Sequence, residues 1–368
     1  METTAQPASI GDPPWDLPVT PPIDPMLASP AGDLLPDRDD LAFEPKWDGF
    51  RMLAFRSGSR IALQGRGGDD LSYAFPELVA SLRDSLPERA VLDGEAIILR
   101  GGTLDFPALG SRLRPRTDAH TISRLASESP ATYVAFDALA LGDRSLLDAP
   151  YRLRREALES LGSPRAGFAL TPMTLDREVA LRWFHDFEGG GLDGLMAKPV
   201  DSPYSPGKRT LLKIKHRRTL DAVVAGWRGH AKDPDRVGSL LLGLYDTRGL
   251  LQHVGAASGF SAQRGREIAE YVASYALAEG SDHPWTREAA PVGLRRPGAA
   301  NRWNRGRDQA WHALRPVLVA EVAYDQFEGD RLRHVATWLR WRPDRDASSC
   351  TYAQVALPAP VDIEALLS

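Results

Sequence analysis

The stretch Glu44-Pro45-Lys46-Trp47-Asp48-Gly49-Phe50-Arg51 decides how the rest of the chain is interpreted. Apolar and polar residues alternate on both sides of its Asp-Gly pair, which predicts a strand, a tight turn and a second strand. A lysine at a strand end with an arginine close behind it is typical of an activated amine nucleophile, because the lysine must lose its proton to attack and nearby positive charge favours that loss. The stretch alone is also compatible with a surface hairpin.

Lysine usage points to the same part of the chain. Of 45 basic residues only six are lysines, and five of these lie between residues 46 and 215. Lysine can lose its proton and act as a nucleophile, and it presents a compact charge to phosphate, whereas arginine does neither equally well. The pattern therefore predicts that the chemistry lies within residues 46–215.

Size, composition and charge restrict the class of protein. A chain of 368 residues with 43% hydrophobic residues has room for two or three globular domains. Residues 1–40 hold eight acidic residues and one basic residue, which leaves a net charge of +3 on residues 41–368 and is compatible with nucleic-acid binding. The single cysteine, Cys350, excludes an intrachain disulfide and a Cys-rich zinc site, and it favours a reducing cytoplasm. The sequence has neither a signal peptide nor an apolar run that could span a membrane, so no membrane partner is expected.

The pattern of elements changes along the chain. Residues 1–40, rich in Pro and Asp, predict an extended arm that packs on or leads into the first domain. Residues 20–217 mix strands and helices irregularly, which predicts an α+β domain with antiparallel sheets and helices. Residues 218–368 show short strands and one helical stretch at 262–277, which predicts a small Greek-key β-barrel of the OB-fold type.

Five further segments and one arginine follow the lysine in a fixed order. Together they resemble the motifs of the covalent nucleotidyltransferases, the superfamily of ATP-dependent DNA ligases, RNA ligases and mRNA capping enzymes, over roughly residues 20–345. The segments are QGRGG with Arg66, VLDGEAII (91–98), YVAFDAL (133–139), GLDGLMAKP (191–199), LLKIK (211–215) and TWLRWRPDRD (337–346).

The resemblance implies an adenylation domain followed by an OB-fold domain, with ATP and Mg²⁺ (Mn²⁺ as an alternative) as cofactors. Lys46 is expected to become covalently attached to AMP, with Glu95 and Asp193 as metal ligands, although Asp193 stands where the family more commonly has glutamate. The other residues expected to bind the nucleotide are Glu44 at the adenine amino group, Phe136 stacked on the base, Glu95 near the ribose, and Arg51, Arg66, Lys198, Lys213 and Lys215 near the phosphates.

Basic residues in the second domain predict contacts with DNA. The segment 293–307 holds five arginines, one tryptophan and no acid, which favours a phosphate-contacting loop, with a disordered basic loop as the alternative. Arg340 and Arg342, two apart, share a strand face and could orient the leaving pyrophosphate. The expected DNA contacts are Arg295, Arg296, Arg302, Arg305, Arg340 and Arg342.

These features predict an ATP-dependent DNA ligase resembling the stand-alone ligase C type of actinobacteria. We expect a bacterial, cytoplasmic monomer that associates with the nucleoid, seals nicked double-stranded DNA and acts in DNA repair. The alternatives are an RNA ligase or capping-type enzyme, and a non-enzymatic nucleic-acid-binding protein, which would take up no AMP. NAD-dependent ligases carry a four-cysteine zinc site, which one cysteine cannot form.

Overall fold

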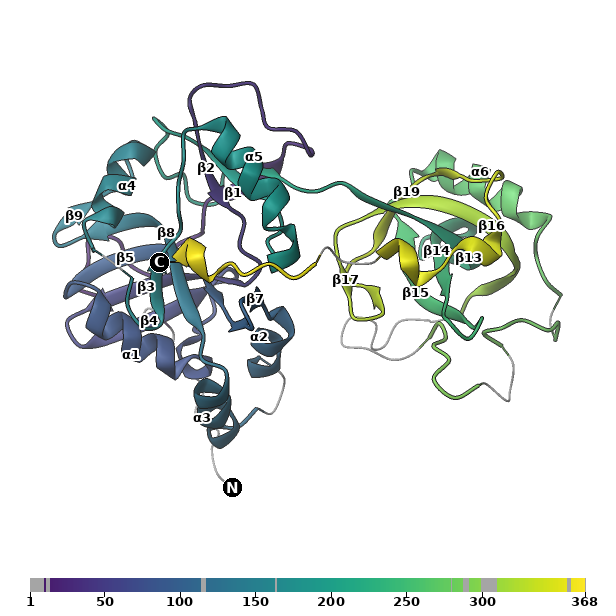
Figure 1. Ribbon diagram of the computed structural model, residues 1–368, viewed down its shortest axis with the longest axis horizontal. Coiled ribbons are helices and arrows are strands. Elements are labelled where there is room, and N and C mark those ends of the chain that lie inside the picture. The colour runs from purple at the N-terminus through teal and green to yellow at the C-terminus, as the bar shows by residue number, and fades with distance from the viewer. Residues whose placement is uncertain are drawn as a thin grey trace. The chain divides into compact units, whose positions relative to one another are not determined.

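The computed structural model describes residues 10, 14–113, 117–162, 164–278, 280–286, 291–298, 310–355 and 359–367. Its contacts divide the chain into two units (Figure 1). Unit 1 comprises Met1–His216 with Pro358–Ser368, and unit 2 comprises Arg217–Leu357. The residues from Pro358 onward, expected from the sequence in the second domain, group with unit 1 instead, because Ile363 is fully buried in a hydrophobic cluster of that unit.

The larger sheet of unit 1 is covered on both faces. Its strands follow the order β10-β8-β5-β3-β4, with β9 paired to β8. One face packs against helices through a core that includes Leu78 of α1 and Leu158 of α4. The other face packs against the N-terminal arm, whose Trp15 and Leu17 are buried. The strands are β3 (Phe50–Ser57), β4 (Arg60–Gly65), β5 (Arg89–Ile97), β8 (Thr132–Leu141), β9 (Arg144–Ser145) and β10 (Phe168–Leu170).

The smaller sheet of unit 1 has one apolar and one polar face. Its order is β1-β12-β11-β2, and α5 (Arg177–Asp186) packs on the apolar face through Phe184. Because side chains alternate along a strand, Leu195 and Ala197 of β11 face α5 while Lys198 faces the other way. The strands are β1 (Leu27–Pro30), β2 (Leu41–Pro45), β11 (Leu195–Pro199) and β12 (Arg209–Ile214).

The remaining elements of unit 1 are short. Proline at the first position of α1 has no N–H that needs a partner, and the aspartate caps of α3 and α5 accept hydrogen bonds from the first backbone N–H groups of these helices. The elements are α1 (Pro76–Ser85), α2 (Phe106–Arg112), α3 (Ala119–Glu128), α4 (Tyr151–Glu159), the hairpin β6 (Leu99–Arg100) and β7 (Thr103–Leu104), and the 3-10 turns η1 (Ser72–Ala74), η2 (Glu188–Gly190) and η5 (Glu364–Leu367).

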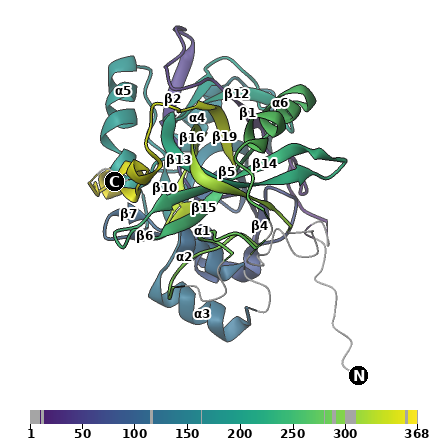
Figure 2. The same cartoon turned by 90° about the vertical axis from the view of Figure 1, so that its right-hand side faces the viewer.

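Unit 2 is a closed barrel of strands β13-β14-β15-β19-β16, which can be followed in Figure 2. Closure depends on a short parallel pairing of β15 with β19, and α6 packs against the barrel through Ile268 and Val272. Across the described residues, every helix is too short or too polar to cross a lipid bilayer. The elements are β13 (Arg218–His230), β14 (Asp233–Tyr245), β15 (Leu251–Ser258), α6 (Ala262–Ala273), β16 (His312–Tyr324), β17 (Phe327–Glu328), β18 (Arg331–Leu332), β19 (Ala336–Trp341), η3 (Ala347–Ser349) and η4 (Tyr352–Val355).

Candidate active site

The polar face of the smaller sheet and one face of the larger sheet line a cavity of about 280 Å³ in unit 1. Leu211, Lys213 and Lys215 reach it from one side because they alternate with residues that face α5. All nine residues predicted to bind the nucleotide line this cavity: Glu44, Lys46, Arg51, Arg66, Glu95, Phe136, Lys198, Lys213 and Lys215. Residues from six strands (β2, β3, β5, β8, β11 and β12) and from the ends of β2, β4 and β12 therefore converge on one space.

Lys46 lies directly after β2 and shares a carboxylate with a second lysine. Its Nζ is 2.7 Å from Asp193 Oδ2, and Lys215 Nζ is 2.8 Å from the same oxygen. Burial alone would raise the pKa of Asp193, but the charges of Lys46 and Lys215 outweigh it and lower that pKa. Two lysines therefore surround the carboxylate of Asp193 at this end of the cavity, and their ammonium groups could also contact a phosphate group.

The backbone around this ion pair is also fixed. The Lys46 amide donates to the Gly194 carbonyl (2.9 Å), and the Asp193 amide donates to the Lys46 carbonyl (3.0 Å). Gly194 has φ +121°, and a Cβ there would lie 2.0 Å from the Ile214 carbonyl oxygen. Only glycine fits at this position, which explains why glycine follows Asp193 in the sequence.

The opposite end of the cavity is buried. Glu44 Oε2 is 2.8 Å from Lys198 Nζ, and both residues are only 2% exposed. Tyr151 of α4 donates its hydroxyl hydrogen bond to Glu44 Oε1, and Lys198 also donates to the Phe136 carbonyl (2.8 Å). Lys198, expected near the phosphates, thus lies with Glu44 and Phe136, because β11 pairs with β2 in a register that places Met196 opposite Glu44.

Arg51 connects the cavity to the N-terminal arm. Its guanidinium binds both Asp93 oxygens (3.0 and 2.6 Å) and donates to the Met26 carbonyl (2.5 Å). Tyr204 donates to Asp93 Oδ2 (2.7 Å) and accepts from the Met26 amide (3.0 Å). Burial disfavours the charged guanidinium, but Asp93 outweighs it and raises the pKa of Arg51. Arg51 is therefore a fixed cation whose position depends on the arm.

Glu95 is the most perturbed carboxyl group of the cavity. Burial raises its pKa to about 7, although the charges of Lys46 and Arg51 act in the opposite direction. Within the described part of the chain, no hydrogen bond or ion pair to its side chain is formed. A carboxyl group with a raised pKa that lines a cavity beside a lysine is a candidate functional group.

Three residues that hold the cavity-lining side chains in place were not predicted from the sequence. Asp93 lies inside the VLDGEAII segment, two residues before Glu95, so its motif was available as a signal. Tyr151 and Tyr204 lie outside the segments that carry the resemblance, and only the fold brings their hydroxyl groups to Glu44 and Asp93.

Comparisons with known proteins bear on this site. The models of the ATP dependent DNA ligase domain and of the ATP dependent DNA ligase C terminal region match residues 25–215 and 233–345. The chain is 46% identical to DNA ligase C2 of Mycolicibacterium smegmatis, over 93% of this chain and 97% of that protein. It is 45% identical to DNA ligase C of Mycobacterium tuberculosis, over 94% of this chain and 97% of that protein. The chain belongs to the ATP-dependent DNA ligase family.

The predicted resemblance to stand-alone ligases of the C type is thereby confirmed. A solved Lig E DNA ligase with a TM-score of 0.52 and 19% identity covers 87% of this chain and 99% of that chain. At this identity it supports the fold alone. The family supports the predicted pair of nucleotidyltransferase and OB-fold domains.

The arginines predicted to contact DNA lie in unit 2 of this ligase. Arg295 is paired with Asp330, and Arg340 Nε is 2.6 Å from Glu321. Arg342 binds Asp221 (3.0 Å) and Asp344 (2.8 Å). Arg296 is also among the described residues, whereas Arg302 and Arg305 lie outside them. To contact phosphates, Arg295, Arg340 and Arg342 must exchange carboxylate partners, so their DNA contacts stay a prediction.

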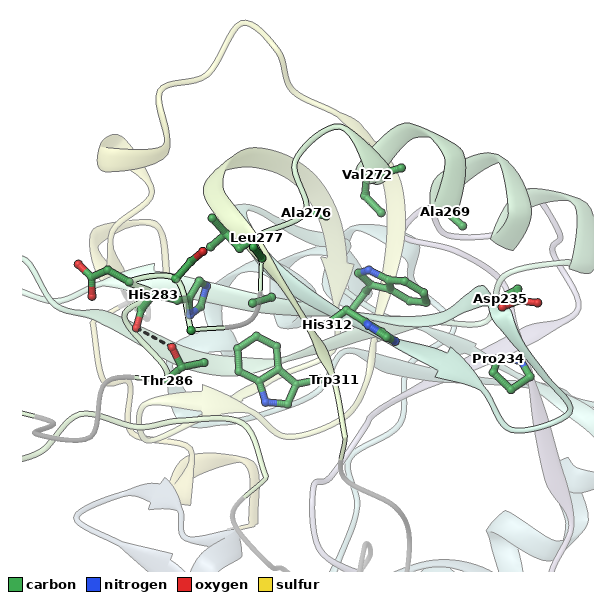
Figure 3. A pocket seen from close by; sticks show the side chains of 17 residues that line it. Pro234, Asp235, Ala269, Val272, Ala276, Leu277, His283, Thr286, Trp311 and His312 are labelled. Atoms are coloured by element: carbon green, nitrogen blue, oxygen red, sulfur yellow. Dashed lines mark hydrogen bonds between the residues drawn. The ribbon is translucent and has the colours of Figure 1, made fainter.

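Unit 2 of the ligase also contains a larger cavity, of about 1400 Å³, shown in Figure 3. Trp311, His283 and Thr286 lie at one end, and Pro234 and Asp235 at the other. Of the described residues that line it, none is lysine or arginine. A triphosphate needs cations around it, so the smaller cavity of unit 1 is the better candidate for the active site despite its size.

Proposed function

We propose that this ligase seals 5′-phosphate/3′-hydroxyl nicks in double-stranded DNA, with Lys46 as the residue that carries AMP. The observation that carries the proposal is the position of Lys46 Nζ, which lies in a cavity with six other cationic side chains and 2.7 Å from a buried carboxylate. Family membership supports ATP as the nucleotide and DNA as the second substrate.

The first step joins Lys46 to AMP. The ammonium group must lose its proton, after which Nζ forms a bond to the α-phosphorus of ATP. The bond from that phosphorus to the oxygen of the β-phosphate breaks, and pyrophosphate leaves with the electron pair. Lys213, Lys215 and Arg66 line the cavity and would stabilise the charge on the phosphates.

Two further transfers complete the reaction. AMP passes from Lys46 to the 5′-phosphate of the nick, which frees the lysine. The 3′-hydroxyl then attacks that phosphate, a phosphodiester forms and AMP leaves. We propose that unit 2 supplies the DNA surface and rotates between the first and last steps, with the ligase acting as a monomer.

The carboxylates of Glu95 and Asp193 fit a magnesium ion, or manganese in its place. Both interact electrostatically with Lys46, so both act at the same end of the cavity. The described residues contain no group of three metal-ligating side chains, and magnesium commonly binds one or two carboxylates together with substrate phosphates. The ion would neutralise charge on the triphosphate during the first step.

Glu44 supports the choice of adenine. Its carboxylate oxygens accept a hydrogen bond from Tyr151 and pair with Lys198, so this end of the cavity presents an acceptor. The 6-position of adenine carries an amino donor, whereas guanine carries a carbonyl acceptor there. An acceptor at this end therefore favours ATP over GTP.

The test is the incorporation of label and the sealing of nicks by wild type and Lys46→Ala. Wild type should take up label from [α-³²P]ATP but not GTP and should seal a nicked DNA duplex, whereas Lys46→Ala should do neither. A parallel substrate with a nicked RNA duplex separates DNA from RNA ligation. Sealing by Lys46→Ala would overturn the proposal.

A further inference from the structure

The last residues of the chain form part of unit 1. We call residues 359–367 the C-terminal strap. Although the strap follows the barrel in sequence, it groups with unit 1, where Figure 1 shows the C-terminus. Ile363 is fully buried in a hydrophobic cluster, and its amide donates to the Gly102 carbonyl (2.9 Å) in the turn between β6 and β7.

The other buried residues of this cluster are neighbours of the site in sequence. Trp47 follows Lys46, and Leu192 precedes Asp193. Ile97 and Val134 lie two residues from Glu95 and Phe136, respectively, along β5 and β8. Ile363 thus completes an apolar cluster to which four of the segments that carry site residues contribute one residue each.

The cluster is rigidly connected to the nucleophile. Trp47 is 5% exposed and donates from Nε1 to Thr171 Oγ1 (2.8 Å), which fixes its ring. The Lys46 carbonyl accepts a hydrogen bond from the Asp193 amide, so the two backbone segments that carry Trp47 and Leu192 are hydrogen-bonded to each other. A shift of either apolar side chain would therefore move the Lys46–Asp193 ion pair.

Two glycines leave space for the strap. A Cβ at Gly189 would lie 2.0 Å from the Ala359 oxygen, and one at Gly190 would lie 2.2 Å from Ile363 Cγ2. In both cases the three nearest atoms all belong to the strap, and neither glycine has a left-handed φ. Alanine is excluded at these positions by the strap alone, so the surface of η2 is shaped to receive it.

We propose that Ile363 is a positioning residue for the adenylation reaction, which holds Lys46 and Asp193 in the geometry needed for attack on the α-phosphate. This inference rests on the proposed function, in which Lys46 carries AMP. It makes the C-terminal strap a working part of the active site in unit 1.

The test compares two steps of the reaction in the full-length chain. The first is the single-turnover rate of Lys46–AMP formation at saturating ATP. The second is the sealing of a nick whose 5′ end already carries AMP, because that step needs no attack by Lys46. The variants are Ile363→Ser, which opens the cluster, and Gly190→Ala, which displaces the strap without changing it. The matched controls are Glu364→Ser, exposed beside Ile363, and Gly110→Ala, where a Cβ has open space.

Both variants should slow adenylation by about tenfold or more, because small misplacements of reacting groups are costly in rate. Sealing of the adenylated nick should stay within about threefold of wild type, and both controls within about twofold in either step. Equal losses in the two steps, or unchanged adenylation by both variants, would overturn the inference. Lys46→Ala in the same assay tests the proposed function separately: AMP uptake by that variant would overturn both, whereas wild-type rates in the strap variants would overturn only the role of Ile363.

Discussion

The two ends of the unit 1 cavity differ in how completely their charges are paired. At the end proposed to bind the base, here called the base end, Glu44 and Lys198 are each 2% exposed, and Tyr151 and the Phe136 carbonyl satisfy them further. At the end proposed to bind the phosphates, here called the phosphate end, the Lys46 and Lys215 side chains are 20% and 23% exposed, and both contact the carboxylate of Asp193.

This difference separates recognition from chemistry. A buried, fully bonded ion pair is costly to form but holds its groups in one geometry, which suits the selection of a base. Partly exposed lysines can instead exchange their carboxylate partner for a phosphate when the nucleotide binds and return to it when pyrophosphate leaves. Each of the following substitutions tests one side of this contrast.

The largest effect is expected from Lys46→Arg at the phosphate end. Arginine keeps the positive charge beside Asp193 but cannot be deprotonated in a protein, so it cannot attack phosphorus. AMP uptake should fall by more than about 10³-fold, while the free energy of unfolding stays within about 0.5 kcal/mol. Intact-mass spectrometry and denaturant unfolding measure the two quantities. Retained AMP uptake by this variant would show that the charge of Lys46, and not its amine, is what matters.

The same substitution at both ends should give unequal losses of stability. Lys198→Met leaves the buried Glu44 carboxylate without its ion-pair partner and should cost about 3–5 kcal/mol of unfolding free energy. Lys215→Met, at the exposed end, leaves Asp193 paired with Lys46 and should cost about 1 kcal/mol or less. Urea denaturation without nucleotide compares the two variants. Equal losses would mean that the ends do not differ in pairing.

Glu95 should make the ligase less stable as the pH rises. Its folded pKa is raised to about 7 from 4.5, so the folded state binds the proton more tightly than the unfolded state. The stability that Glu95 contributes is therefore fully present below pH 4.5 and is lost as the pH rises through about 7. Linkage puts the loss on the order of 3 kcal/mol.

Glu95→Gln removes this titration. In the absence of nucleotide and divalent ions, its stability advantage over wild type should grow between pH 5 and pH 8, even though adenylation is impaired. Glu270→Gln, an exposed site on α6, is the control and should show no such trend. A difference between Glu95→Gln and wild type that is the same at every pH would contradict the prediction.

Strand alternation explains why much of the site could be predicted from the sequence. Glu44 and Lys46, or Lys213 and Lys215, are two residues apart on or next to a strand, so they reach the same cavity whatever the tertiary details. The motif order gave the family, which the comparisons confirm, whereas the roles of the individual residues stay predictions.

Features that depend on distant pairing could not be predicted in this way. Lys198 was expected near phosphate, but the register of β11 on β2 determines that it pairs with Glu44. The helical pattern of 262–277 does not show that α6 ends at Ala273, where the following residues turn to bridge Ala276 with Leu314. The strap likewise depends on glycines 170 residues earlier in the chain, which no local pattern connects to Ile363.

The smallest expected effect tests how the base end is held. Tyr151→Phe removes the hydroxyl that donates to Glu44 Oε1, and losing a buried hydrogen bond to a charged group should cost about 1.5 kcal/mol of stability. Tyr133→Phe is a matched control, because that buried hydroxyl donates to the Met52 carbonyl (2.9 Å) and lies in the helix-side core.

Both variants should lose stability, but only Tyr151→Phe should change base selection. Without the Tyr151 hydroxyl, the Glu44 carboxylate can turn away from the base. The KM for ATP should therefore rise, and the preference for ATP over GTP should fall by about threefold to tenfold. The adenylation rate at saturating ATP should change little, because the Lys46–Asp193 end is untouched. A lower saturating rate with an unchanged KM would instead place Tyr151 at the chemical step and remove the distinction between the two ends.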